Sequence, residues 1–172
     1  MNPYDEDPPL NNRLGKAFSA IAWILALSML WFFFHRMEDN AQHPNRDLNR
    51  AAMEGPTVLK QNRQGHYVTP CYLNNYKAQC LLDTGATVVA VSESLAREIG
   101  LQKGPEVSMS TANGKTTAHA TWLNSVSFGS IELKRVRGII APNMGSEDVL
   151  LGMSALKSLK ITQDQGKLTL TQ

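Results

Sequence analysis

The amino-acid sequence predicts a mostly β domain preceded by one N-terminal transmembrane helix, and three observations support this prediction. Residues 17–34 contain no charged side chain, short β-like runs recur after residue 57, and only two segments among those runs have a helical pattern. The chain has 172 residues, of which 42% are hydrophobic and 19% are charged. This composition excludes a disordered or collagen-like chain and leaves room for one modest domain.

The uncharged run from Ala17 to Phe34 is long enough to cross most of a bilayer's hydrocarbon core. As a helix, its 18 residues would extend about 27 Å. Only Ser19 and Ser28 interrupt it, so it lacks the polar face that a buried helix of a soluble domain would normally have. A cleaved signal peptide is the other alternative, but no A-x-A-like site follows within residues 34–40. We therefore expect residues 1–16 to form a cytoplasmic tail and residues 17–34 to form an uncleaved anchor.

Positive charges favour a cytoplasmic N-terminus. Arg13 and Lys16 precede the apolar run, whereas only Arg36 follows it closely. The remainder of the chain would then lie across the inner membrane, in a periplasmic or other extracytoplasmic compartment where a disulfide can form. Residues 35–56 are polar and without sustained periodicity, which predicts a tether. Residues 57–172 remain as the candidate folded domain.

Residues 57–172 alternate β-like runs with turn signals. The runs are His66–Leu73, Ala78–Leu82, Val88–Val91, Val107–Thr111, Lys115–Trp122, Val126–Phe128, Ile131–Ile140 and Lys167–Thr171. Two short helices are predicted among them. Ser92 can cap a helix from Glu93 to Ile99 that Gly100 ends, and Met153–Leu159 is the second. This order predicts a small closed or sandwiched β architecture.

One acidic residue lies inside an apolar run, LLDTGATVV, as Asp83. Burial of a carboxylate is costly without a partner, so we expect Asp83 to be hydrogen-bonded. Gly85 lets the backbone turn sharply and bring an N–H group toward the carboxylate, and Thr84 can direct its hydroxyl inward. An ordinary Asp-Thr-Gly turn between strands is the alternative, because this tripeptide occurs often by chance.

A second apolar strand that ends in glycine occurs near the C-terminus, as Val149-Leu150-Leu151-Gly152, and precedes the second predicted helix. Between the two glycine turns, residues 109–118 read MSTANGKTTA and contain Asn113-Gly114, the preferred tight hairpin turn. Each half of the domain therefore has a strand, a glycine turn and a helix, with an exposed hairpin between the halves.

These segments resemble the retropepsin-like aspartic proteases, most closely their membrane-anchored bacterial members. The resemblance covers about residues 65–170 and rests on LLDTGATVVAVSESLAREIGL, the hairpin and VLLGMSALKSL. It implies the closed β architecture of retropepsins, with Asp83 as the catalytic carboxylate supported by Thr84, Gly85 and Ala86. The other implied site residues are the substrate-covering flap (Ser110, Thr111, Ala112, Asn113, Gly114, Lys115) and a second supporting loop (Leu150, Leu151, Gly152).

Aspartic proteolysis requires two carboxylates that share one proton, and this chain contains a single Asp-Thr-Gly. We therefore expect a homodimeric endopeptidase with Asp83 from each copy and a peptide or protein substrate. The resemblance also places Lys167–Gln172 at the contact between copies. Because Ala86 lacks the hydroxyl donor that would favour the charged carboxylate, we expect a pH optimum that is only mildly acidic.

Other functions remain as alternatives. The domain could be a noncatalytic dimeric β module that binds partner proteins at the membrane, or the chain could assist a membrane complex mainly through its helix. A thiol dyad of a cysteine with a histidine has no local signature. The four histidines lack metal-ligand spacing, so we expect neither a metal nor another cofactor. The formal charge of +2, without a basic run, argues against nucleic-acid binding.

The two cysteines, Cys71 and Cys80, flank the segment Asn74–Lys77. If the chain turns through all four residues of this segment, Leu73 faces Ala78 and the cysteines are directly opposed, close enough for a disulfide. A shift of the register by one residue would instead leave two buried thiols side by side.

Overall fold

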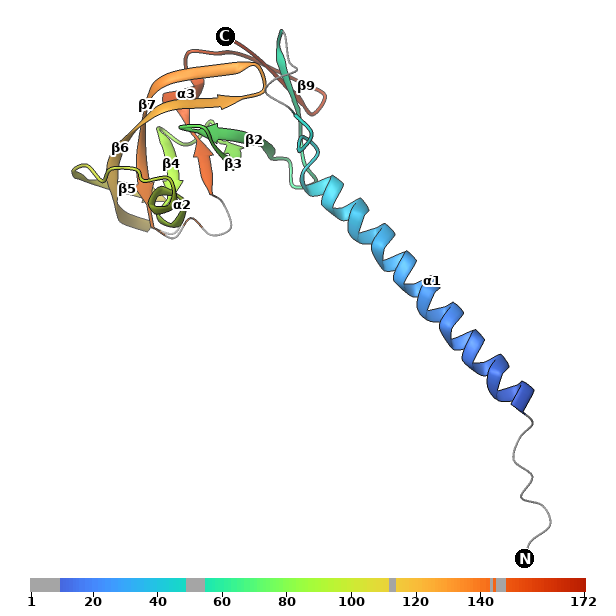
Figure 1. Ribbon diagram of the computed structural model, residues 1–172. Helices are drawn as coiled ribbons and strands as arrows, with labels where there is room; N and C mark the ends of the chain where they lie inside the picture. The colour runs from blue at the N-terminus through green and yellow to red at the C-terminus, as the bar shows by residue number, and fades with distance from the viewer. Residues whose placement is uncertain (1–9, 49–54, 112–113, 143, 145–147) are drawn as a thin grey trace, which may run out of the picture. The chain divides into compact units, whose positions relative to one another are not determined.

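Figure 1 shows the computed structural model, which describes residues 10–48, 55–111, 114–142, 144 and 148–172. The chain divides into two compact units, residues 1–41 and residues 42–172. Helix α1 (Leu10–Gln42) makes up the described part of the first unit. Its large apolar side chains between Phe18 and Met37 are 52–77% exposed, and the helix is long and apolar enough to cross a membrane.

Helix α1 is longer than the predicted anchor. Residues 35–42, which we expected to begin an irregular tether, continue the helix. The physical reason is that this segment contains neither proline nor glycine, and the first helix-breaking residue after the apolar run is Pro44.

The second unit is mostly β, as predicted. Its strands are β1 (Thr57–Lys60), β2 (Tyr67–Leu73), β3 (Tyr76–Leu82), β4 (Val89–Ser92), β5 (Glu106–Thr111), β6 (Gly114–Phe128), β7 (Ile131–Ala141), β8 (Val149–Leu151), β9 (Lys160–Asp164) and β10 (Lys167–Thr171). The short helices are α2 (Glu93–Glu98) and α3 (Met153–Leu156). The predicted cap of α2 is present, because the backbone N–H of Leu95 donates to Ser92 Oγ at 3.3 Å.

The strands form two sheets. A seven-stranded sheet has the order β2-β3-β8-β4-β7-β6-β5, and a further pairing of β2 with β6 closes it on itself (Figure 1). A three-stranded sheet has the order β1-β10-β9. The core inside the closed sheet is apolar, and its largest fully buried side chains include Phe128, Leu73, Leu123 and Leu151. The mostly β fold with a closed sheet is therefore confirmed.

Two further elements, β6 and α3, differ from the predictions. β6 is one continuous strand where we expected Lys115–Trp122 and Val126–Phe128 to be separate, because β7 pairs with it from His119 to Phe128, across the expected break. The register of this pairing is the same on both sides of Arg135, although Arg135 has a positive φ of 53°. Helix α3 ends at Leu156, three residues earlier than expected.

The hairpin of β2 and β3 has a tighter turn than we predicted. Leu73 pairs with Tyr76, so only Asn74 and Asn75 form the turn, with φ angles of 49° and 71°. The expected pairing of Leu73 with Ala78 is wrong. Asparagine tolerates the left-handed conformation that a two-residue turn requires, so the longer turn is not needed.

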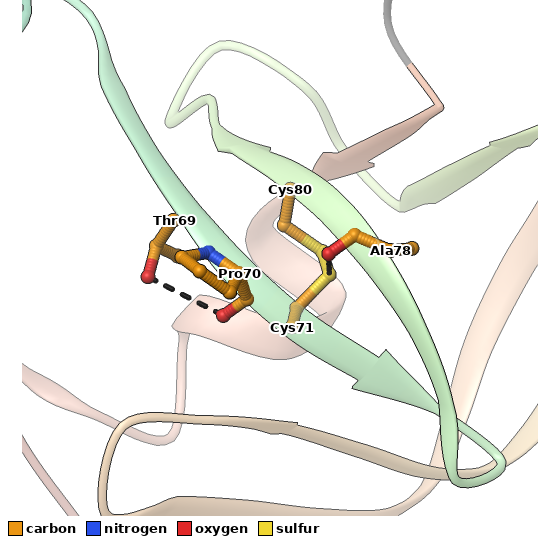
Figure 2. Close-up of a disulfide and its surroundings, with 5 residues drawn as sticks. All are labelled: Thr69, Pro70, Cys71, Ala78 and Cys80. Atoms are coloured by element: carbon orange, nitrogen blue, oxygen red, sulfur yellow. Dashed lines mark hydrogen bonds between the residues drawn. A yellow bond between two sulfur atoms is a disulfide. The ribbon is translucent and has the colours of Figure 1, made fainter. Parts of the chain in front are cut away.

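This register makes Cys71 and Cys80 diagonal rather than direct neighbours. Cys71 pairs with Ala78 and Cys80 with Thr69, and the two cysteine Cα atoms lie 5.8 Å apart. They are joined in a disulfide with an S–S distance of 2.04 Å (Figure 2). The bridge thus fastens two neighbouring strands within the core.

We expect loss of this disulfide to lower the free energy of unfolding by about 2–3 kcal/mol, because the bridge restricts the unfolded chain. The measurement is chemical denaturation of the wild-type protein with and without reductant. The double variant Cys71→Ala/Cys80→Ala is the control, and its unfolding midpoint should not respond to reductant. An equal midpoint for the oxidised and reduced wild-type protein would contradict the expectation.

Part of the expected tether belongs to the β unit. Asn45 is 4% exposed, and its Nδ2 donates to the carbonyl oxygens of Lys60 (2.9 Å) and Val68 (2.8 Å). Its Oδ1 accepts from the Lys60 backbone N–H at 2.8 Å. Leu48 packs against the core. The folded unit therefore includes residues before Thr57, where we expected it to begin.

Candidate active site

Asp83 lies directly after β3, at the start of the loop that leads to β4, and is half-buried. Its backbone N–H donates to the carbonyl of Leu151 at 3.1 Å, which ties the loop to β8. Its Oδ1 accepts from the backbone N–H of Gly85 at 2.8 Å, and its carbonyl accepts from the N–H of Ala86 at 3.2 Å. The expected hydrogen bond to the carboxylate therefore comes from the main chain, two residues further on.

Gly85 is at this position because the backbone approaches the carboxylate closely. A Cβ atom there would lie 3.1 Å from Asp83 Oδ1, tighter than ordinary van der Waals contact. Thr84 and Gly85 are exposed, whereas Asp83 and Ala86 are partly covered. The loop thus presents an orientated carboxylate next to two accessible residues.

The segment after β8 makes three hydrogen bonds to the Asp83 loop and the start of β4, and a fourth to β7. The backbone N–H groups of Met153 and Ser154 donate to the carbonyls of Ala86 (2.8 Å) and Thr87 (3.0 Å). Ser154 Oγ also accepts from the N–H of Val89 at 2.9 Å and donates to the carbonyl of Arg137 at 2.7 Å. The start of α3 therefore holds the second half of the loop, from Ala86 to the start of β4.

Gly152 allows this close support. A Cβ atom at Gly152 would lie 2.4 Å from the carbonyl oxygen of Val88 and 2.6 Å from that of Ala86, distances that real Cβ atoms essentially never show. β8 itself pairs in parallel with β3, with Leu150 opposite Leu81 and Leu151 opposite Leu82. The structure therefore brings together the Asp-Thr-Gly turn and the Leu-Leu-Gly turn, which lie far apart in the sequence.

Sequence reasoning missed Ser154, because a serine in the first turn of a short helix is common and carries no signal of a distant partner. We expect Ser154→Ala to lower the free energy of unfolding by about 1–3 kcal/mol, because it leaves the N–H of Val89 and the carbonyl of Arg137 without this partner. The measurement is thermal denaturation of this variant. The control is Ser158→Ala in the same region, because the exposed Ser158 hydroxyl makes one long hydrogen bond, to the carbonyl of Ala155. Equal destabilisation by both variants would contradict this role.

The expected flap is the hairpin of β5 and β6. Ser110 pairs with Lys115 and Thr111 with Gly114, so Gly114 begins a strand. Ala112 and Asn113, expected to belong to the turn, lie outside the described residues. The hairpin is at one end of the seven-stranded sheet, whereas Asp83 follows a strand near the other end. Because β2 pairs with β6, the sheet closes and its two ends are connected through this pairing.

The strand that pairs with β3 carries a buried tyrosine opposite the last residue before Asp83. Tyr67 on β2 pairs with Leu82, the residue before Asp83, and is 8% exposed. Burial raises the pKa of Tyr67 above its ordinary value, because the phenolate would lose its hydration. Tyr67 is therefore a buried, uncharged side chain on the strand that pairs with β3.

The closed β domain thus contains an Asp-Thr-Gly turn that is held by the segment after a Leu-Leu-Gly turn. The family of gag-polyprotein putative aspartyl proteases matches residues 69–158, a little more than half of the chain. A retropepsin-like aspartic protease from Rickettsia conorii is 32% identical in sequence, with a TM-score of 0.56, over 67% of this chain and 89% of that chain. The chain belongs to the retropepsin-like aspartic protease family.

Two curated relatives are also similar. An uncharacterized protein in the cobV 5′ region of a Sinorhizobium species is 31% identical over 109 residues, and the uncharacterized protein RP867 of Rickettsia prowazekii (strain Madrid E) is 32% identical over 110 residues. Each match covers 62% of this chain, but 47% of the first relative and 46% of the second. The chain thus spans about half the length of these relatives.

Proposed function

We propose that the protein is a membrane-anchored aspartic endopeptidase whose active site forms when two copies bring their Asp83 side chains together. The observation that carries the proposal is the Asp83 loop, in which Gly85 orientates the carboxylate and the Gly152–Ser154 segment holds the backbone. Such preorganisation is what a catalytic group requires, and an ordinary surface turn does not need it.

The chemistry requires the second copy. One carboxylate takes a proton from a water molecule, which attacks the peptide carbonyl, while the other carboxylate protonates the carbonyl oxygen. Within one chain, the position related to the Asp-Thr-Gly turn carries Leu150-Leu151-Gly152, which offers no titratable group. Thr84, next to each aspartate and exposed, is suited to contact the other copy. The flap residues Ser110 to Lys115 would cover the bound peptide.

Helix α1 would anchor the domain in the inner membrane, with the N-terminus inside and the domain in the periplasm. The charge difference between Arg13 with Lys16 and Arg36 supports this orientation. The Cys71–Cys80 disulfide supports it independently, because such bonds persist in oxidising compartments. Confinement to one plane also raises the effective concentration of the copies for each other.

The test is to incubate the full chain, in detergent micelles, with a diverse peptide library and to read new peptide termini by mass spectrometry. Endopeptidase action predicts internal cleavage at a limited set of sequences. Peptides that are retained by the protein but stay intact would contradict the proposal and favour the noncatalytic binding module instead.

A further inference from the structure

We propose that a cavity between strand β7 and helix α3 binds the phosphate group of a phosphate ester. Helix α3 lies beside β7 (Figure 1), and the hydrogen bond from Ser154 Oγ to the carbonyl of Arg137 joins them. The cavity has a volume of about 590 Å³, within the range of small-molecule sites. The described residues that line it belong to neither the Asp83 loop nor the flap, so the proposal goes beyond peptide cleavage.

Three positive side chains line the cavity. Lys134 and Arg135 lie on β7, and Lys157 directly follows α3. All three are exposed to solvent. One negative side chain, that of Glu132, also lines the cavity. Because the positive side chains outnumber the negative one, the cavity should attract an anion.

The charges of Lys134, Arg135 and Lys157 are not balanced by partners in the part of the chain that the structure describes. There, none of these three side chains takes part in an ion pair or a hydrogen bond. Charges of one sign around one cavity repel each other, and salt screens this repulsion only in part at short range. A bound anion would therefore replace repulsion with attraction.

An irregularity in β7 places two of these cations side by side on the surface. Successive side chains of a regular strand face opposite sides of the sheet. In β7, Leu133 is buried, Lys134 and Arg135 are both exposed, and Val136 is buried again. The change of side coincides with Arg135, whose φ is 53°. Without this change, Arg135 would face the core.

The backbone conformation of Arg135 is itself unfavourable for a residue with a side chain. Glycine adopts a positive φ at no steric cost, whereas arginine does not. Backbone strain of this kind occurs preferentially at functional sites, where the side chain has a use that offsets it. The strain therefore indicates that the guanidinium of Arg135 has a role at the cavity.

A phosphate monoester matches this arrangement of charges. Near neutral pH it carries a charge of about −1.5 to −2 and three terminal oxygen atoms that accept hydrogen bonds. The planar guanidinium of Arg135 can donate two parallel hydrogen bonds to such a group, while Lys134 and Lys157 supply point charges. A carboxylate has a single charge and two oxygen atoms, so it should bind more weakly.

Two serine hydroxyls also line the cavity, and they differ in availability. Ser154 Oγ already donates to the carbonyl of Arg137 at 2.7 Å and accepts from the N–H of Val89 at 2.9 Å. The hydroxyl of Ser158 makes one long hydrogen bond, to the carbonyl of Ala155 at 3.5 Å. Ser158 can therefore turn its hydroxyl toward a ligand, while Ser154 continues to support β4.

The test is a calorimetric titration of the full chain, in uncharged detergent micelles, with inorganic phosphate at constant ionic strength. We expect saturable binding, and Lys157→Gln should weaken it at least about fivefold because one charged hydrogen bond is lost. The matched control is Lys160→Gln, which removes the same charge at an exposed position on β9 and should stay within about twofold of the wild-type affinity.

Heat that does not saturate would overturn the proposal, and so would equal phosphate affinity in the wild-type protein and Lys157→Gln. Calorimetry requires no peptidase activity. Phosphate binding and the proposed endopeptidase activity can therefore each fail without the other.

Arg135→Gly separates phosphate binding from the stability of the fold. Glycine relieves the left-handed backbone, so the variant should unfold at the same temperature as the wild-type protein or at a higher one. Loss of the guanidinium should nevertheless weaken phosphate binding at least about fivefold. Unchanged phosphate affinity in this variant would contradict the role of Arg135.

The remainder of the ester is either a soluble group or a lipid, and both present the same phosphate chemistry to the cavity. The titration is therefore repeated with glycerol 3-phosphate and with phosphatidic acid dissolved in the micelles, at equal phosphate concentration. Tighter binding of phosphatidic acid assigns a lipid headgroup, and equal or weaker binding assigns a soluble ester. Failure of both to compete with inorganic phosphate, or equally tight binding of acetate, would show that the cavity is not a phosphate-ester site.

Discussion

Replacement of Asp83 by asparagine should reduce peptidase activity by about three orders of magnitude or more, because it removes the group that exchanges protons with water and substrate. Folding should be preserved, since the asparagine side-chain oxygen can still accept from the N–H of Gly85. The measurement is the rate of peptide cleavage by the full chain, together with thermal unfolding of the same sample.

The matched control is Asp148→Asn, at an exposed aspartate that precedes β8. It makes the same chemical change and should leave cleavage within about twofold of the wild-type rate, as surface substitutions usually do. Comparable cleavage by the Asp83 variant and the wild-type protein would remove Asp83 from the mechanism.

Gly152→Ala should be the most damaging single methyl addition near the site. The new Cβ atom would overlap the carbonyl oxygens of Val88 and Ala86, so the backbone around the Asp83 loop must shift. We expect the free energy of unfolding to fall by about 3 kcal/mol and peptidase activity to fall at least about a hundredfold, because a small displacement of a catalytic group is costly. Denaturation and cleavage assays on one sample measure both effects.

Gly15→Ala in helix α1 is the matched control, because nothing lies within 4 Å of the position its Cβ would occupy. It should change neither property. Wild-type stability and activity in Gly152→Ala would show that the Leu-Leu-Gly turn does not constrain the Asp83 loop.

Local sequence patterns predict those helices and strands that are specified by their own residues rather than by distant partners. The apolar run of α1, the β-like runs and the Ser92 cap belong to this group, and the structure confirms them. β1 and β9 were not predicted. β1 is only four residues long, and β9 has one apolar residue, Ile161, so both exist mainly because β10 offers them an edge.

In the candidate site, too, local patterns were predictable and contacts between distant residues were not. Asp83 and the two glycine turns were visible as short patterns. The contacts of Ser154 and Asn45 were not, because each side chain bonds to backbone groups that are distant in sequence: Ser154 to Val89, and Asn45 to Lys60 and Val68. The register of the disulfide hairpin depended on whether two or four residues form the turn, a choice that local preference alone did not decide.

The most direct test of a site shared by two copies is to add the Asp83→Asn chain to a fixed amount of wild-type chain. With free exchange of copies and excess substrate, an equal amount should lower peptidase activity to about half, and a ninefold excess to about a tenth, because mixed dimers carry one aspartate. Activity that stays constant as the inactive chain is added would contradict the account and show that a single Asp83 suffices.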